Sequence, residues 1–142
     1  MKPTINYRAA FVAAIVQFAI GVLWYSPVLF VTRWLKDTGL AADMAQQLTR
    51  TQLATVYGGS LVAFFVCYCV MAQFAHYVNA KNAKEGAQLS LWLWLGFTAT
   101  TLLVNINYQM KPLSLFLIDA SYWLISMIIG GMIIATWKKK TA

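Results

Sequence analysis

Charged side chains are scarce in this chain, and acidic ones are the scarcest. Among its 142 residues, Asp and Glu together number four, Lys and Arg number 11, and His76 is the single histidine. About a quarter of the residues in a typical soluble domain are charged, whereas here the share is 11%. One histidine also excludes a haem group held by two His ligands. The composition therefore argues against a soluble enzyme.

Cysteine is almost as rare, and its placement excludes further chemistry. Cys67 and Cys69 are two residues apart, so on a helix they point about 200° apart and cannot pair with each other. Together with His76 on the same segment, they cannot complete a tetrahedral zinc site. A Ser-His-Asp triad is excluded because His76 and Asp119 are expected near opposite membrane faces. We therefore predict no metal, no cofactor and no catalytic residue, and an enzyme is the least favoured reading.

Long apolar stretches fill the chain instead. They cover residues 8–30, 53–77, 87–109 and 113–137, and each has about 23 to 25 residues, where about 20 suffice to cross a bilayer as a helix. This predicts an all-α integral membrane protein, a four-helix bundle forming a single transmembrane domain over residues 1–142. No small-residue cleavage site ends the first stretch, so we expect it to be retained rather than removed as a signal peptide.

The only sizeable segment outside these spans is 32–52. Within it, Leu40, Met44 and Leu48 recur at every fourth position, which is the spacing of one helix face. Gly39 is expected to break the segment in two. We therefore predict one or two short amphipathic helices lying on the membrane surface between the first and second spans.

Basic residues near the span ends indicate the orientation. With four spans, the side that carries both chain ends holds seven of them, and the other side holds four. Because cytoplasmic loops carry an excess of Lys and Arg, we expect both termini in the cytoplasm. The net charge of +7 suits anionic lipid head groups, and we expect a lipid bilayer rather than a nucleic acid as the partner.

Polar residues inside the spans are the strongest functional signal, because they are costly in a membrane unless paired or hydrated. Asp119 is the only acidic residue within a span, about 10 Å below the outer boundary at 1.5 Å per residue. The third span runs antiparallel to the fourth, so Asn105 and Asn107 are expected at a similar depth. The candidate ligand-binding residues are Asp119, Asn105, Asn107, Tyr122, Trp24 and Tyr25. Both a binding role and simple helix packing stay open for Asp119.

One run of the sequence carries a family resemblance. Residues 21–30 read GVLWYSPVLF, and Trp34 follows. Further matching positions are Gly96, Phe97, Pro112, residues 115–118, Tyr122 and Trp137. With these features the chain resembles the membrane family catalogued as domain of unknown function 1761. The resemblance implies a small four-span protein of bacterial type, hence in the bacterial cytoplasmic membrane, and implies no particular activity.

Two functional interpretations follow. The first is a protein that binds or passes a small ligand, lipid or ion through a polar cavity in the outer half of the bundle. The second is a structural or accessory subunit of a membrane complex, whose polar groups only lock helices together. A single four-span protomer is too thin for a wide pore, so a channel would require a homo-oligomer or a larger assembly.

Overall fold

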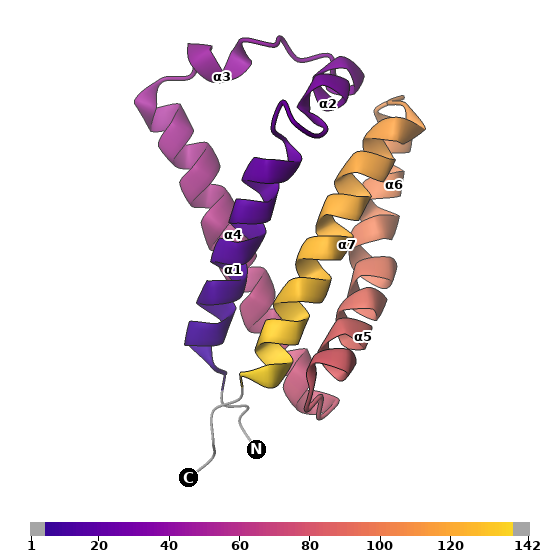
Figure 1. The fold of residues 1–142 in the computed structure, drawn as a ribbon. Coiled ribbons are helices and arrows are strands. Elements are labelled where there is room, and N and C mark those ends of the chain that lie inside the picture. The colour runs from indigo at the N-terminus through magenta and orange to yellow at the C-terminus, as the bar shows by residue number, and fades with distance from the viewer. Residues whose placement is uncertain (1–4, 138–142) are drawn as a thin grey trace.

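The computed structural model describes residues 5–137, and all regular structure within this range is helical (Figure 1). The elements are α1 (Tyr7–Trp24), α2 (Val31–Thr38), α3 (Met44–Gln47), α4 (Arg50–Tyr77), α5 (Ala83–Leu93), the π-helical turn η1 (Trp94–Ala99), α6 (Thr100–Tyr108) and α7 (Leu113–Thr136). Four helices are long and apolar enough to cross a membrane: α1, α4, the continuous α5–η1–α6 and α7. The prediction of an all-helical chain with four such helices is confirmed. The basic residues Lys2 and Lys138 to Lys140 lie outside the described range.

Helix α7 lies at the centre of the arrangement. It packs against α1, α4 and α5, and 44% of its most apolar window is buried, compared with 6% for α4. In Figure 1, α1 and α4 diverge toward the end that carries α2 and α3, here called the α2 end; α1 begins and α7 finishes at the opposite end. The four long helices are thus closely packed at one end and opened at the other.

The first long helix is shorter than the predicted span. Helix α1 ends at Trp24, short of residue 30, and turns occupy the interval before α2. Pro27 lies in this interval and has no backbone N–H to continue a helix. The Trp24 carbonyl instead accepts a 3.2 Å hydrogen bond from the Phe30 amide, which closes the turn. A helix is expected to end or to kink at a proline, and α1 ends here.

The segment between α1 and α4 contains two short helices, α2 and α3, as predicted, but its leucines are not arranged as predicted. Gly39 ends α2 with a left-handed φ of 75°, a conformation that glycine adopts without strain, so the break is confirmed. Leu40, however, follows that break and is 40% exposed, while Leu48 is extended beyond α3. The two leucines therefore do not share a helix with Met44. For Leu48 the physical reason is the capping box of α4. The side chains of Thr49 and Gln52 each hydrogen-bond the other residue's backbone N–H, which holds the chain before α4 extended.

Glycine sets the closest helix contact. A Cβ atom at Gly86 of α5 would collide with the Gly131 carbonyl oxygen of α7, and one at Gly131 would collide with Ser90. The Ser90 hydroxyl donates a 2.9 Å hydrogen bond to the Gly86 carbonyl, so it needs no partner on α7. Small residues therefore allow the two backbones to approach closely, a way of packing that small residues also permit between membrane helices.

Candidate functional site

Asp119 meets the turn that follows α1. The Tyr25 hydroxyl donates a 2.8 Å hydrogen bond to Oδ1 of Asp119, and the Trp34 side chain of α2 faces the same carboxyl group. One residue earlier on α7, the Ile118 carbonyl accepts a 3.1 Å hydrogen bond from the Trp24 indole. The structure therefore brings together Trp24, Tyr25 and Asp119, as the sequence predicts.

Tyr122 joins the same cluster from the next turn of α7. It is 5% exposed, and its ring centre lies 5.3 Å from that of Tyr25 in an edge-to-face contact. Its hydroxyl donates a 3.2 Å hydrogen bond to the Gln17 carbonyl of α1. Tyr122 therefore connects α7 to α1 just below the Tyr25–Asp119 pair.

The two asparagines do not reach this cluster. Asn105 and Asn107 are exposed on α6, and among the described residues neither side chain has a hydrogen bond to Asp119. Ile106 between them is 6% exposed and faces the interior instead. Successive residues of an α-helix are rotated by about 100° around its axis, and the π-helical turn η1 changes that rotation within the same span. Equal depth in the span was therefore insufficient to predict contact.

A second polar cluster ties α2 to the start of α7, and sequence reasoning missed it. Asp37 accepts hydrogen bonds from Arg33, at 3.0 Å, and from the Ser114 hydroxyl. The Arg33 guanidinium also donates a 3.0 Å bond to Ser114, and Lys111 Nζ donates a 2.7 Å bond to the Thr38 carbonyl. The Ser114 hydrogen bond, followed by the Arg33 guanidinium, holds the pKa of Asp37 below its ordinary value. Nothing in the sequence pairs Asp37 with Ser114, which lies 77 positions away.

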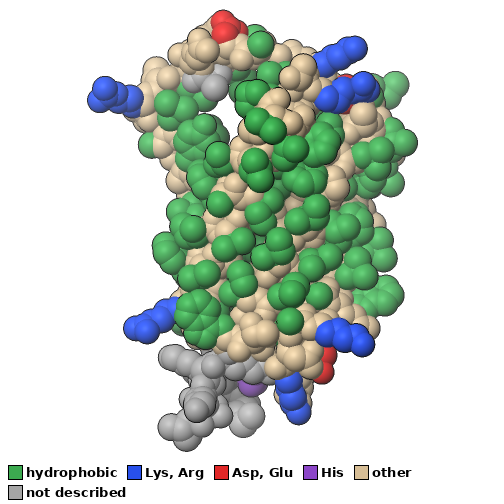
Figure 2. All heavy atoms as spheres, in the orientation of Figure 1, with side chains coloured by type: hydrophobic (Ala, Val, Ile, Leu, Met, Phe, Trp, Pro, Cys, Tyr) green, Lys and Arg blue, Asp and Glu red, His purple; other side chains and the backbone are tan. Residues whose placement is uncertain are grey.

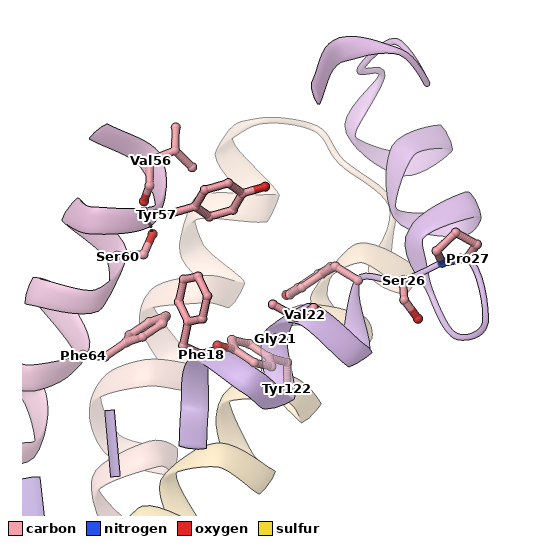
Figure 3. Close-up of a pocket in the computed structure, with 11 residues that line it drawn as sticks. Phe18, Gly21, Val22, Ser26, Pro27, Val56, Tyr57, Ser60, Phe64 and Tyr122 are labelled. Atoms are coloured by element: carbon pink, nitrogen blue, oxygen red, sulfur yellow. Dashed lines mark hydrogen bonds between the residues drawn. The ribbon is translucent and has the colours of Figure 1, made fainter. Parts of the chain in front are cut away.

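A cavity of about 560 Å³ lies beside the Tyr25 cluster, where α1 and α4 diverge. Figure 3 shows Tyr57 and Ser60 of α4 on one side, facing Phe18 and Val22 of α1. We call it the α1–α4 cavity. Its lining residues are Phe18, Gly21, Val22, Tyr25, Ser26, Pro27, Val56, Tyr57, Ser60, Phe64 and Tyr122. Of the candidate ligand-binding residues named from the sequence, Tyr25 and Tyr122 belong to this lining.

The lining combines apolar walls with hydroxyl groups and carries no charge. Five of its eleven residues are aromatic, and none is Asp, Glu, Lys or Arg. The hydroxyls of Tyr25 and Tyr122 are engaged with Asp119 and Gln17. The Ser26 hydroxyl is buried and has no hydrogen-bond partner among the described residues. The cavity can therefore accept an uncharged molecule that has both apolar surface and a hydrogen-bonding group.

Metal chemistry finds no support in the same range. Over residues 5–137 no group of three or more His, Cys, Asp or Glu side chains is placed to hold a metal ion. Both cysteine thiols are free and partly buried.

The family model described as "Protein of unknown function (DUF1761)" matches residues 8–135. No curated protein and no solved structure matches the chain significantly. The residues that line the α1–α4 cavity all fall within the matched range, so the cavity is part of the region that the family model describes.

Proposed function

We propose a function from the geometry, because the chain belongs to the DUF1761 family of proteins of unknown function: it binds a neutral amphiphile in the α1–α4 cavity. By neutral amphiphile we mean a molecule with an apolar chain and an uncharged, hydrogen-bonding head, such as a monoacylglycerol. The observation that carries the proposal is a cavity of about 560 Å³ whose lining is uncharged and includes the unpaired, buried Ser26 hydroxyl.

The proposal includes the membrane setting. We place the four long helices across the bacterial cytoplasmic membrane as a bundle, with the α2 end outside and both chain ends in the cytoplasm. Figure 2 supports a membrane-spanning arrangement, since on the face shown hydrophobic side chains cover the middle and Lys and Arg side chains lie at the two ends. The choice of the outside end is based on the count of basic residues. The α1–α4 cavity then lies at the level of the outer leaflet, where lipids are its immediate neighbours.

The chemistry of the lining selects the class of ligand. A charged head group would lose its hydration without meeting an opposite charge, because no charged side chain lines the cavity. Phe18, Val22 and Phe64 offer apolar contact for a chain. Ser26 and Tyr57 offer hydroxyls to a head group that donates or accepts hydrogen bonds. The volume also falls within the range of about 300–1,000 Å³ typical of small-molecule sites.

The polar contacts along α7 keep one wall of the cavity in place. Tyr25 is fixed by Asp119, and α2 is fixed by the bond between Ser114 and Asp37. The opposite wall, on α4, is more exposed: Val56 and Tyr57 are 50% and 51% exposed. A ligand would therefore enter past α4, from the lipid side, rather than through α2.

Photo-crosslinking of the purified protein in nanodiscs tests the proposal. The probe is a diazirine-bearing monoacylglycerol, competed with unlabelled monoacylglycerol or with phosphatidylglycerol. We expect crosslinks on α1 and α4 at the cavity, displaced by the neutral competitor only. Val22→Trp should lower crosslinking at least tenfold by filling the cavity. Val62→Trp is the matched control, because Val22 and Val62 are 62% and 63% exposed and Val62 does not line the cavity.

Failure of specific crosslinking would instead favour a structural or accessory subunit. One observation favours this second candidate: α4 is the least buried of the four long helices. Gly58 and Gly59 on it have open space where a Cβ atom would lie, so a helix of a partner protein or of a second copy could approach there. Native mass spectrometry in nanodiscs would then show an oligomer or a retained partner, and no displaceable amphiphile.

A further inference from the structure

The centre of the helix arrangement contains polar atoms that nothing in the described residues satisfies. The side chain of Gln17 on α1 is completely buried, at 0% exposure. Neither its amide nitrogen nor its amide oxygen has a hydrogen-bond partner there. Ser126 on α7 is 1% exposed, and its hydroxyl is also unpaired. Buried polar groups in folded proteins are almost always hydrogen-bonded, so these atoms point to a bound molecule.

Two tyrosines enclose this place. The Tyr122 side chain lies next to both the Gln17 and the Ser126 side chains, which places the unpaired groups around one common neighbour. From α4, the Tyr68 hydroxyl donates a 2.9 Å hydrogen bond to the Ser126 carbonyl, and Tyr68 is 0% exposed. A Cβ atom at Gly130 would collide with the Tyr68 ring. A glycine at that position thus makes room for a phenol at the centre of the arrangement.

The unpaired atoms define what can bind. A primary amide needs a ligand that accepts from its N–H groups and donates to its oxygen, and a serine hydroxyl can do either. A metal cation would satisfy only the oxygens, and an anion would satisfy only the N–H groups. Neither Gln17 nor Ser126 lines the neighbouring α1–α4 cavity, whereas Tyr122, which lies next to both, does. A small neutral molecule that both donates and accepts is required, and water fits this description.

We infer that water binds between Gln17 and Ser126, forming a hydrated site at the centre of the membrane-spanning helices behind Tyr122. This inference is independent of the proposed amphiphile, since neither Gln17 nor Ser126 lines the α1–α4 cavity. The bound water joins α1 to α7 by hydrogen bonds that the two helices do not make directly.

X-ray hydroxyl-radical footprinting of the full chain in detergent micelles tests the inference. Radiolysis of a bound water produces a radical that oxidises the side chains beside it, even where bulk solvent has no access. Tyr68 is completely buried, so we expect its oxidation only if water lies nearby. Gln17→Leu combined with Ser126→Ala should lower the oxidation rate of Tyr68 at least fivefold. Gln88→Leu, at an exposed glutamine of α5, is the matched control and should leave the rate unchanged.

Two results would overturn the inference. One is an unoxidised Tyr68 in the parent protein, under a dose that oxidises the exposed Tyr77. The other is an equal rate in the parent and in the double variant. If the double variant fails to fold, a rapid pulse of H₂¹⁸O on the parent replaces it. We then expect Tyr68 to incorporate ¹⁶O from a slowly exchanging bound water, while the exposed Tyr77 incorporates ¹⁸O from the bulk solvent. Incorporation of ¹⁸O at the same rate in both tyrosines would contradict a bound water.

Discussion

The hydroxyl of Tyr25 donates a 2.8 Å hydrogen bond to Oδ1 of Asp119, across 94 positions of sequence. This bond joins the turn after α1 to the second turn of α7, directly beside the bond between the Trp24 indole and the Ile118 carbonyl. A phenol requires only an acceptor from its partner, and an amide oxygen accepts as a carboxyl oxygen does. The contact therefore depends on the shape and acceptor of Asp119 rather than on its charge.

Substitutions of Asp119 should show whether the contact depends on its hydrogen-bond acceptor or on its charge. Asp119→Asn retains an acceptor, and we expect it to be nearly as stable as the parent. Asp119→Leu leaves the Tyr25 hydroxyl unpaired and should lower the free energy of unfolding by about 1 to 3 kcal/mol. Unfolding in mixed micelles measures this. Leu117→Ala, at an exposed position of the same helix, is the control for general changes on α7.

A double-mutant cycle sharpens the same prediction. Tyr25→Phe removes the donor, so Asp119→Leu should cost less in that background than in the parent. Equal costs in both backgrounds would show that Tyr25 and Asp119 are not coupled, and a leucine variant as stable as the parent would contradict the role of the bond altogether.

The tether between α2 and α7 should weaken in acid. Because Ser114 and Arg33 hold the folded-state pKa of Asp37 below the ordinary value, the carboxylate stabilises the fold fully above about pH 3.9. That contribution is lost as the pH falls through the lower, folded-state pKa. A spin label at Thr32→Cys, in a variant without the native cysteines, should become more mobile in this range. Asp37→Asn should make its mobility independent of pH there, whereas the same transition in that variant would refute the assignment. A label at Val62→Cys on α4 is the control.

The contact of α5 with α7 predicts opposite effects for the same substitution at different glycines. Gly131→Ala places a methyl group against Ser90 and should destabilise the protein by about 1 to 3 kcal/mol through overpacking. Gly58→Ala meets open space and should be neutral or stabilising by up to about 1 kcal/mol, because alanine favours helix more than glycine does. Thermal unfolding in one detergent compares them. Similar melting temperatures for the two variants would mean that α5 and α7 are not in close contact.

The sequence predicted the parts of the fold that depend on local composition. Apolar runs gave the four long helices, Pro27 gave the end of α1, and Gly39 gave the end of α2. Two short helices between the first and second spans were also predicted correctly, but the shared helix face of Leu40, Met44 and Leu48 was not. Their spacing carries no information about the capping box that starts α4.

The candidate site was predictable only where depth and chemistry coincided. Trp24, Tyr25 and Asp119 share a depth and have complementary groups, so their contact followed. Asn105 was predicted at the same depth but is exposed on α6. The face on which a residue lies depends on how the span is rotated about its axis, which the apolar run does not encode. The walls of the α1–α4 cavity depend on the divergence of two helices, and no local pattern reports an angle between helices.

The last prediction concerns orientation in the membrane. Four long helices place α3 and the α4–α5 turn at opposite ends of the molecule (Figure 1), so a reagent that cannot cross the membrane should reach only one of them. Seven basic residues against four favour the cytoplasm for the end that carries the α4–α5 turn. Ala42→Cys and Lys81→Cys, both at exposed positions, test this in a variant that lacks Cys67 and Cys69.

In intact cells, an impermeant maleimide should label Ala42→Cys and spare Lys81→Cys. Both should react equally after the membrane is permeabilised, which controls for the intrinsic reactivity of each thiol. Labelling of Lys81→Cys alone would invert the orientation and move the α1–α4 cavity to the cytoplasmic leaflet. Labelling of both in intact cells would contradict a four-span topology. In that topology one span, α4, separates the two positions, so they lie on opposite sides of the membrane.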